Sequence, residues 1–206
     1  MTDDERAPSP EEMLRLIEEQ QAAASRRFIP DPLLLYVPWG VAWLIGFGMF
    51  FLTYGFDGEG IVQLPWEVSL AVLMGCQLMA LGLLVLATAR SGAHVRGESE
   101  QRGAMYGMTW FVGMSAVGLI GSRFADYLPD EQVSLLFTAF LMLMVGVLYM
   151  AGGAMYRHWG QFFLGIWVAV IDLIGVTLGP GWHPLLMAVL VGGGAIVAGC
   201  WMKWRR

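Results

Sequence analysis

The sequence predicts an all-α integral membrane protein with six transmembrane helices. Hydrophobic residues make up 57% of the 206 residues and charged residues 14%, a balance outside that of soluble domains. Six apolar stretches each approach the ~20 residues that a helix needs to cross a bilayer. Basic residues gather on one side of these stretches, as the positive-inside rule requires. We further expect three helical hairpins, with both termini cytoplasmic.

The first 32 residues are expected to be a cytoplasmic N-terminal segment with a short amphipathic helix over about 10–27. Ser9 is a good N-cap, Pro10 suits the first helical position, and Glu12 completes a capping box. Two roles remain open for this helix. It is a solvated helix at the inner face, or it docks a membrane surface or a partner protein. The residues of its apolar stripe include Met13, Leu16 and Ile17.

Residues 33–206 are expected to form a single six-helix transmembrane domain, because the spans and their short connections use nearly all of this sequence. Short patterns of bulky residues before a glycine recur in the odd-numbered spans, which fits three repeated hairpins or chance in a glycine-rich chain. The predicted spans are 33–54, 65–89, 104–122, 132–153, 160–178 and 183–202.

The positive charges predict the orientation. Of the 12 basic residues, only Arg123 falls on the side opposite the termini, so both termini are expected in the cytoplasm. The protein would then be a multi-pass protein of the cell membrane. The preference for arginine over lysine favours a bacterial source. The basic residues on the predicted inner side are Arg6, Arg15, Arg26, Arg27, Arg90, Arg96, Arg102, Arg157, Lys203, Arg205 and Arg206.

Asp172 is the acid placed well inside a predicted span, the fifth. A charged side chain near the bilayer centre costs at least ~2.5 kcal/mol on insertion scales, so such residues usually face the bundle interior and serve a function. Asp172 is therefore a candidate proton- or cation-responsive carboxylate. Alternatively, it is a structural group that is protonated or paired. The candidate partners are Gln77, Ser115, Thr138, Thr177 and Arg123, the last reaching inward from the third span.

The other chemistry-bearing residues predict no catalytic, cofactor or metal site, and we expect no enzyme and no nucleic-acid partner. His94 and His158 fall in inner loops and His183 at the outer edge of the sixth span, so we expect no two histidines at one depth for haem or zinc ligation. We expect Cys76 and Cys200 to be small buried residues at different depths, without a disulfide.

The glycine run at Gly192, Gly193 and Gly194 is the strongest helix-packing signal, because small residues let helix backbones approach closely in membranes. It predicts tight packing of the sixth span within one subunit, an oligomer interface or a backbone passage for solute, in that order. The pairs of small residues spaced by four elsewhere are Ala42/Gly46, Ala71/Gly75, Gly103/Gly107, Gly165/Ala169, Gly175/Gly179, Ala188/Gly192 and Ala195/Gly199.

One short segment, Gly46-Phe47-Gly48-Met49, resembles part of the signature of the acetate/succinate uptake family of six-helix channels. In that family a preceding Asn-Pro-Ala-Pro-Leu-Gly-Leu belongs to the signature. Here the proline-containing segment is Pro30-Asp31-Pro32-Leu33 and the asparagine is absent. The resemblance covers four residues and the topology, so no functional residue is transferred.

Two functions remain open. In the first, the protein is a transporter, channel or permease component for a small solute or ion, with Asp172 and the glycines of the sixth span near the path. In the second, it is a non-conducting accessory or assembly subunit that docks partners through its N-terminal helix. Asp172 favours the first, and the scarcity of polar residues inside the spans favours the second. The expected partners are the lipid bilayer and further copies or other membrane subunits.

Overall fold

The structure, a computed structural model, is helical and describes residues 9–28, 31–56, 60–92 and 98–205. Six helices in this part of the chain are long and apolar enough to cross a membrane, which confirms the predicted number of spans. The sixth is built from three consecutive segments, one of them a π-helix. The elements are α1 (Pro10–Phe28), α2 (Pro32–Tyr54), α3 (Trp66–Gly92), α4 (Glu98–Ala125), α5 (Asp130–Met155), α6 (Trp159–Leu178), α7 (Trp182–Leu186), the π-helix η2 (Met187–Gly192) and α8 (Gly193–Trp204).

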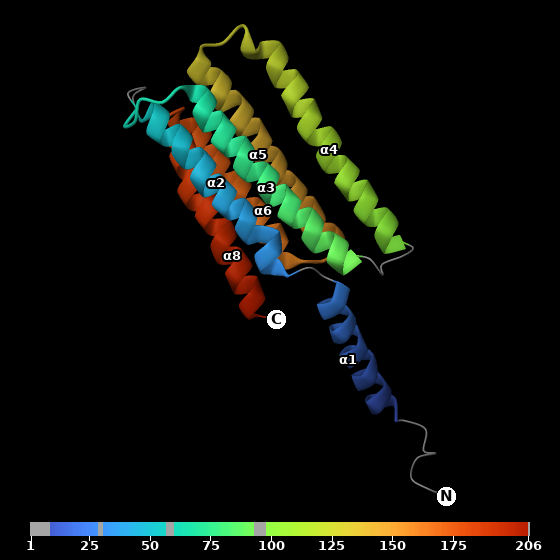
Figure 1. The fold of residues 1–206 in the computed structure, drawn as a ribbon. Helices are drawn as coiled ribbons and strands as arrows, with labels where there is room; N and C mark the ends of the chain where they lie inside the picture. The colour runs from blue at the N-terminus through green and yellow to red at the C-terminus, as the bar shows by residue number, and fades with distance from the viewer. Residues whose placement is uncertain (1–8, 29–30, 57–59, 93–97, 206) are drawn as a thin grey trace, which may run out of the picture.

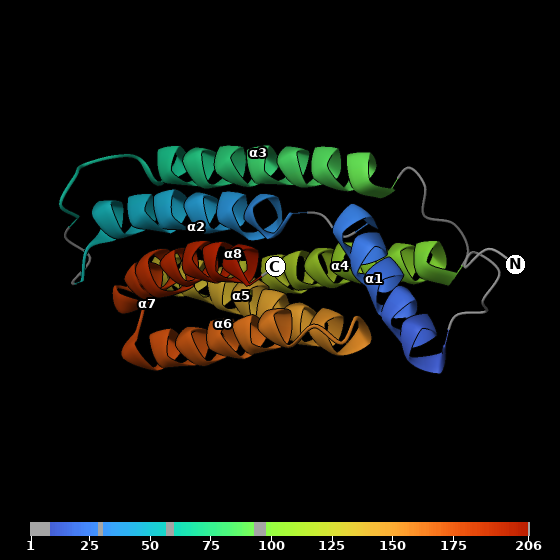
Figure 2. The same cartoon turned by 90° about the horizontal axis from the view of Figure 1, so that it is seen from below.

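The spans pack side by side as a bundle, and α1 projects from one end of it (Figure 1). Helix α2 packs against α3 and against α8 and η2, whereas α5 packs most extensively against α6. Helix α4 stands at the edge and packs mainly against α5. The view from below in Figure 2 places α3 on the outer side of α2. Consequently α3 and α4 present most of their apolar surface outward, toward the lipid of a bilayer.

Helix boundaries follow local sequence more than hydropathy. Helix α4 begins at Glu98, six residues before the predicted span, because the polar residues that precede the apolar stretch are themselves helix formers.

At the start of α1 the predicted capping box is formed. The Glu12 carboxylate accepts the Ser9 N–H at 2.8 Å, and the Ser9 hydroxyl accepts the Glu12 N–H at 3.2 Å.

The core lies among α2, α5, α6, η2 and α8 and consists of buried aliphatic and aromatic side chains. Van der Waals packing rather than water exclusion holds helices together in a membrane, so close contact matters more than apolar area. The core residues are Tyr36, Trp43, Phe47, Met142, Val145, Tyr149, Leu164, Val168, Ile171, Met187, Ala188, Val191, Ala195 and Met202.

Gly192 lies where α2 and η2 approach most closely. A Cβ atom at Gly192 would lie 2.8 Å from the Gly40 carbonyl oxygen and 2.8 Å from the Leu44 nitrogen. Gly194 instead faces the indole of Trp167, and nothing lies within 4 Å of a Cβ built at Gly193. The glycine run therefore packs within the chain at its first and third positions, and its middle position is open.

Polar contacts tie the ends of the spans together. Ser69 of α3 is fully buried and its hydroxyl lies 2.7 Å from that of Thr53 in α2. At the opposite end Asp31 caps α2 by accepting the Leu33 N–H, and its carboxylate also pairs with Lys203 of α8. This ion pair brings the start of the first span and the end of the sixth to the same end of the bundle (Figure 1).

The two cysteines are free. Their expected burial is wrong for Cys200, which is exposed on α8, and Cys76 is only half-buried on α3. The apolar character of cysteine does not distinguish a core position from an exposed one in a chain whose outer surface is also apolar.

Replacing Gly192 with alanine should destabilise the protein by about 1–3 kcal/mol, because the added methyl group meets backbone atoms that cannot move aside. Gly193→Ala is the matched control and should be neutral or stabilising by up to about 1 kcal/mol through helix propensity. Thermal unfolding of both variants in detergent micelles provides the comparison. Equal stability of the two variants would contradict the close contact between α2 and η2.

Candidate functional site

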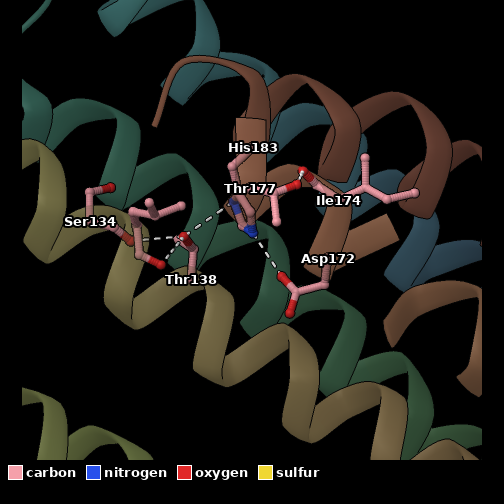
Figure 3. Close-up of polar contacts among 7 residues, drawn as sticks. Ser134, Thr138, Asp172, Ile174, Thr177 and His183 are labelled. Atoms are coloured by element: carbon pink, nitrogen blue, oxygen red, sulfur yellow. Dashed lines mark hydrogen bonds and ion pairs between the residues drawn. The ribbon is translucent and has the colours of Figure 1, made fainter. Parts of the chain in front are cut away.

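The site is a buried contact between a carboxylate and an imidazole. The Nε2 atom of His183 lies 2.7 Å from Oδ1 of Asp172. The Asp172 side chain is 2% exposed and that of His183 is 0% exposed. Figure 3 shows the two side chains pointing toward each other from α6 and α7. Among the described residues, these two and Ser69 are the fully buried polar side chains.

A tight turn brings these two helices together. Helix α6 ends at Leu178, and Gly179 adopts a φ of +99°, which favours glycine. The His183 N–H then donates to the Gly179 carbonyl at 3.1 Å, so the chain reverses within one helical turn. Gly175 lies one turn from Asp172 on the same face of α6. A Cβ there would lie 2.9 Å from Cδ2 of His183, so glycine makes room for the imidazole.

Thr138 of α5 is the third member of the site. Its Oγ1 lies 3.4 Å from Nδ1 of His183, a long contact, and also donates to the Ser134 carbonyl at 2.8 Å or to that of Leu135 at 3.2 Å. A hydroxyl has one hydrogen to donate and two lone pairs to accept. While the Thr138 hydrogen goes to its own helix, its oxygen can accept a hydrogen from Nδ1. Three helices thus meet at the imidazole.

This arrangement can hold a variable number of protons. With an ionised Asp172 and a neutral His183 that is protonated at Nε2, the pair carries one negative charge. Adding a proton at Nδ1 makes the pair neutral overall, and both ring nitrogens then have acceptors, Oδ1 of Asp172 and Oγ1 of Thr138. The site can therefore take up and release a proton without a change of side-chain partners.

The structure brings together few of the partners predicted for Asp172. Thr138 reaches the site through His183, but Thr177 is exposed and donates to Ile174 of its own helix. Ser115 is exposed on α4, and Arg123 is exposed near the end of α4, where its guanidinium lies 6.0 Å from the Tyr127 ring. Gln77 is half-buried on α3, which packs against α2 rather than α6.

The predicted partners of Asp172 do not include His183, which the structure places against its carboxylate. His183 was placed at the outer edge of the sixth span, but the tight turn folds its side chain inward onto Asp172. The signal was present in the sequence: the segment Gly179-Pro180-Gly181 between the two spans is too short for anything but an immediate reversal. His158, by contrast, caps α6 by accepting the Gln161 N–H. His94 lies outside the described residues.

The π-helix that follows α7 gave no sequence signal. Segment η2 widens the helix just after His183, and the indole Nε1 of Trp167 donates to the Leu190 carbonyl at 2.8 Å. Such π-segments are rare and occur frequently at functional sites. Here the segment begins four residues after the histidine and ends at Gly192, so it fixes where α7 sits relative to α8.

Comparison with protein-family models, with curated proteins and with solved structures found no match for this chain. The function must therefore be argued from the site and the fold.

Asp172→Ala and His183→Ala should each destabilise the protein by about 3–5 kcal/mol, because each leaves a buried polar partner without its hydrogen bond. The double variant should lose less stability than the two single variants together. The difference, which is the coupling free energy, should be about 1–3 kcal/mol. Thermal unfolding of the parent, the two single variants and the double variant in micelles measures the four stabilities that this comparison needs. Thr177→Val on the exposed face of α6 is the control. Additive effects would show that the two side chains do not interact.

Gly175→Ala should displace the imidazole, because the new methyl group would overlap the ring edge. We expect a loss of about 1–3 kcal/mol of stability and a changed ¹⁵N chemical shift of the His183 ring. Gly118→Ala on α4, where nothing lies within 4 Å of the added Cβ, should leave the His183 signal unchanged and be neutral or stabilising by up to about 1 kcal/mol. An unaltered His183 signal in the Gly175→Ala protein would refute the role of Gly175.

Proposed function

We propose that this polytopic membrane protein moves a small solute or ion across the membrane and that the Asp172–His183 pair is its proton- or cation-responsive element. The observation that carries the proposal is the 2.7 Å contact between two ionisable side chains that are both fully buried. Ionisable groups inside membrane helices mark ion pathways and proton relays more often than not. The adjoining π-helix η2 supports a role beyond packing.

The proposal includes the topology expected from the sequence. Residues 1–32 form a cytoplasmic segment, residues 33–206 form the membrane domain of three helical hairpins, and both termini face the cytoplasm of a bacterial cell. The positive-inside distribution of arginine and lysine supports this orientation. The ion pair between Asp31 and Lys203 supports the placement of both ends of the membrane domain on one side, because it joins the ends of the first and sixth spans. The proposal assigns no catalytic reaction to the chain.

A second candidate is a non-conducting accessory or assembly subunit. Its support is the exposed apolar surface of two elements. On α1 the side chains of Met13, Leu16 and Ile17 are about half exposed, and in the most apolar part of α4 no residue is buried. Further copies of the chain or other membrane subunits would cover such surfaces in an assembly. This candidate predicts stable co-purification of a partner, whereas transport predicts flux by the isolated protein.

Flux through the purified protein in proteoliposomes tests the transport proposal. A pH-sensitive dye inside the vesicles reports proton movement while ammonium, acetate and potassium gradients are applied in turn. Asp172→Asn should reduce the flux on the order of 10-fold or more, because asparagine keeps a hydrogen-bond acceptor for His183 but cannot ionise.

Thr177→Val is the matched control on the same helix and should conduct like the parent protein. Flux that is unchanged in Asp172→Asn would overturn the role of the pair. If the parent protein moves none of these ions, and a partner co-purifies and is lost on deletion of residues 1–29, the accessory function replaces the transport function.

A further inference from the structure

A pocket lies next to the buried pair, at the end of the bundle opposite α1. It measures about 260 Å³ and opens where the end of α2, the start of α5 and the turn into α7 meet. Since a water molecule occupies ~30 Å³ of liquid volume, the pocket has room for several. Its lining includes Ser134 and Thr138, two hydroxyl-bearing residues one helical turn apart on α5. The pocket is thus both large enough and polar enough for water.

Thr138 and His183 both line this pocket, and Thr138 is the more exposed of the two. Thr138 is half-buried and lines the pocket, whereas the His183 side chain is 0% exposed although it also lies at the pocket wall. Water in the pocket can therefore reach the Thr138 hydroxyl without touching the ring. That hydroxyl lies 3.4 Å from Nδ1 and 2.8 Å from the Ser134 carbonyl. Rotation about its C–O bond turns the hydrogen from the carbonyl to the ring nitrogen.

The opposite side of the pair is closed by apolar side chains. About one to two turns farther along α5, α6 and η2, the buried residues of the core among the described part of the chain are aliphatic or carry methionine sulfur. A proton has no polar partner among these side chains, and isolated charges in such surroundings are costly. These residues are Met142, Val145, Leu164, Val168, Met187 and Val191.

We propose that the pair exchanges protons with water in this pocket through the Thr138 hydroxyl, and that it does so from this side of the bundle alone. A hydronium ion in the pocket gives a proton to the Thr138 oxygen while the hydrogen already on that oxygen passes to Nδ1. The products are water, an intact hydroxyl and a ring protonated at both nitrogens. The ring then donates to Oδ1 of Asp172 and to Oγ1 of Thr138.

Few other titratable groups lie where they could take up the proton in place of the pair. Among the described residues that line the pocket or form the pair, the titratable side chains are Tyr54, Asp172 and His183. The α5 residues that line the pocket, Ser134, Leu135 and Thr138, carry no titratable side chain. The inference rests on the same pair as the proposed function, but its readout is proton exchange rather than solute flux. A pair that only stabilises the fold would still exchange through this pocket.

A pH jump on the protein in lipid nanodiscs, followed by time-resolved infrared difference spectroscopy, tests the inference. Bands that vanish in Asp172→Asn and in His183→Gln identify the pair. Thr138→Val keeps the shape of the side chain without its hydroxyl, and it should slow the exchange on the order of 10-fold or more. Thr138→Ser keeps the hydroxyl and should exchange within about threefold of the parent. Equal rates in Thr138→Val and the parent would overturn the relay.

A second variant tests the route itself and does not depend on Thr138. In a Cys76→Ala/Cys200→Ala background, Ser134→Cys places one thiol in the pocket, and a bulky charged thiol reagent should then block the exchange. A thiol at Asp126→Cys, exposed in the turn that follows α4, is the control and should leave the rate unchanged after modification. Exchange that stays fast with a modified Ser134→Cys would show that protons arrive by another path.

Discussion

The contact between Asp172 and His183 is the constraint on which the rest of the site depends. In a bundle whose core is apolar, either side chain alone would lose its water without gaining a partner, at a cost of several kcal/mol. Each side chain supplies that partner for the other, because Nε2 of His183 lies 2.7 Å from Oδ1 of Asp172. The contact requires the reversal at Gly179 and the open space at Gly175. The hydrogen bond therefore depends both on the local sequence of the turn and on the packing of α6 against α7.

The surrounding helices hold α7, which carries His183, in a defined place. Segment η2 continues from it and is fixed by the Trp167 indole on one side and by the approach of Gly192 to Gly40 on the other. Any change in the register of η2 would move His183 relative to α6. This connection gives a physical route by which the protonation of one buried pair could alter the packing of the sixth span.

Much of the fold could be predicted from the sequence, but half of the site could not. Hydropathy and length identify six spans because the bilayer imposes both, and the cost of an ionisable group in lipid singles out Asp172. His183 was missed because its depth depends on a turn of three residues, and a small error in the span boundary moves it to the surface. The π-helix depends on tertiary contacts such as Trp167 to Leu190, which periodicity does not encode.

Solid-state NMR on the protein in lipid bilayers, with ¹⁵N-labelled histidine and ¹³C-labelled aspartate, measures the contact between His183 and Asp172 itself. We expect a through-space correlation between Nε2 of His183 and the carboxyl carbon of Asp172, which disappears in His183→Gln. His158, which caps α6, serves as an internal reference without such a correlation to Asp172. A fully labelled sample with a resolved His183 signal and no correlation to Asp172 would show that the two side chains are not paired.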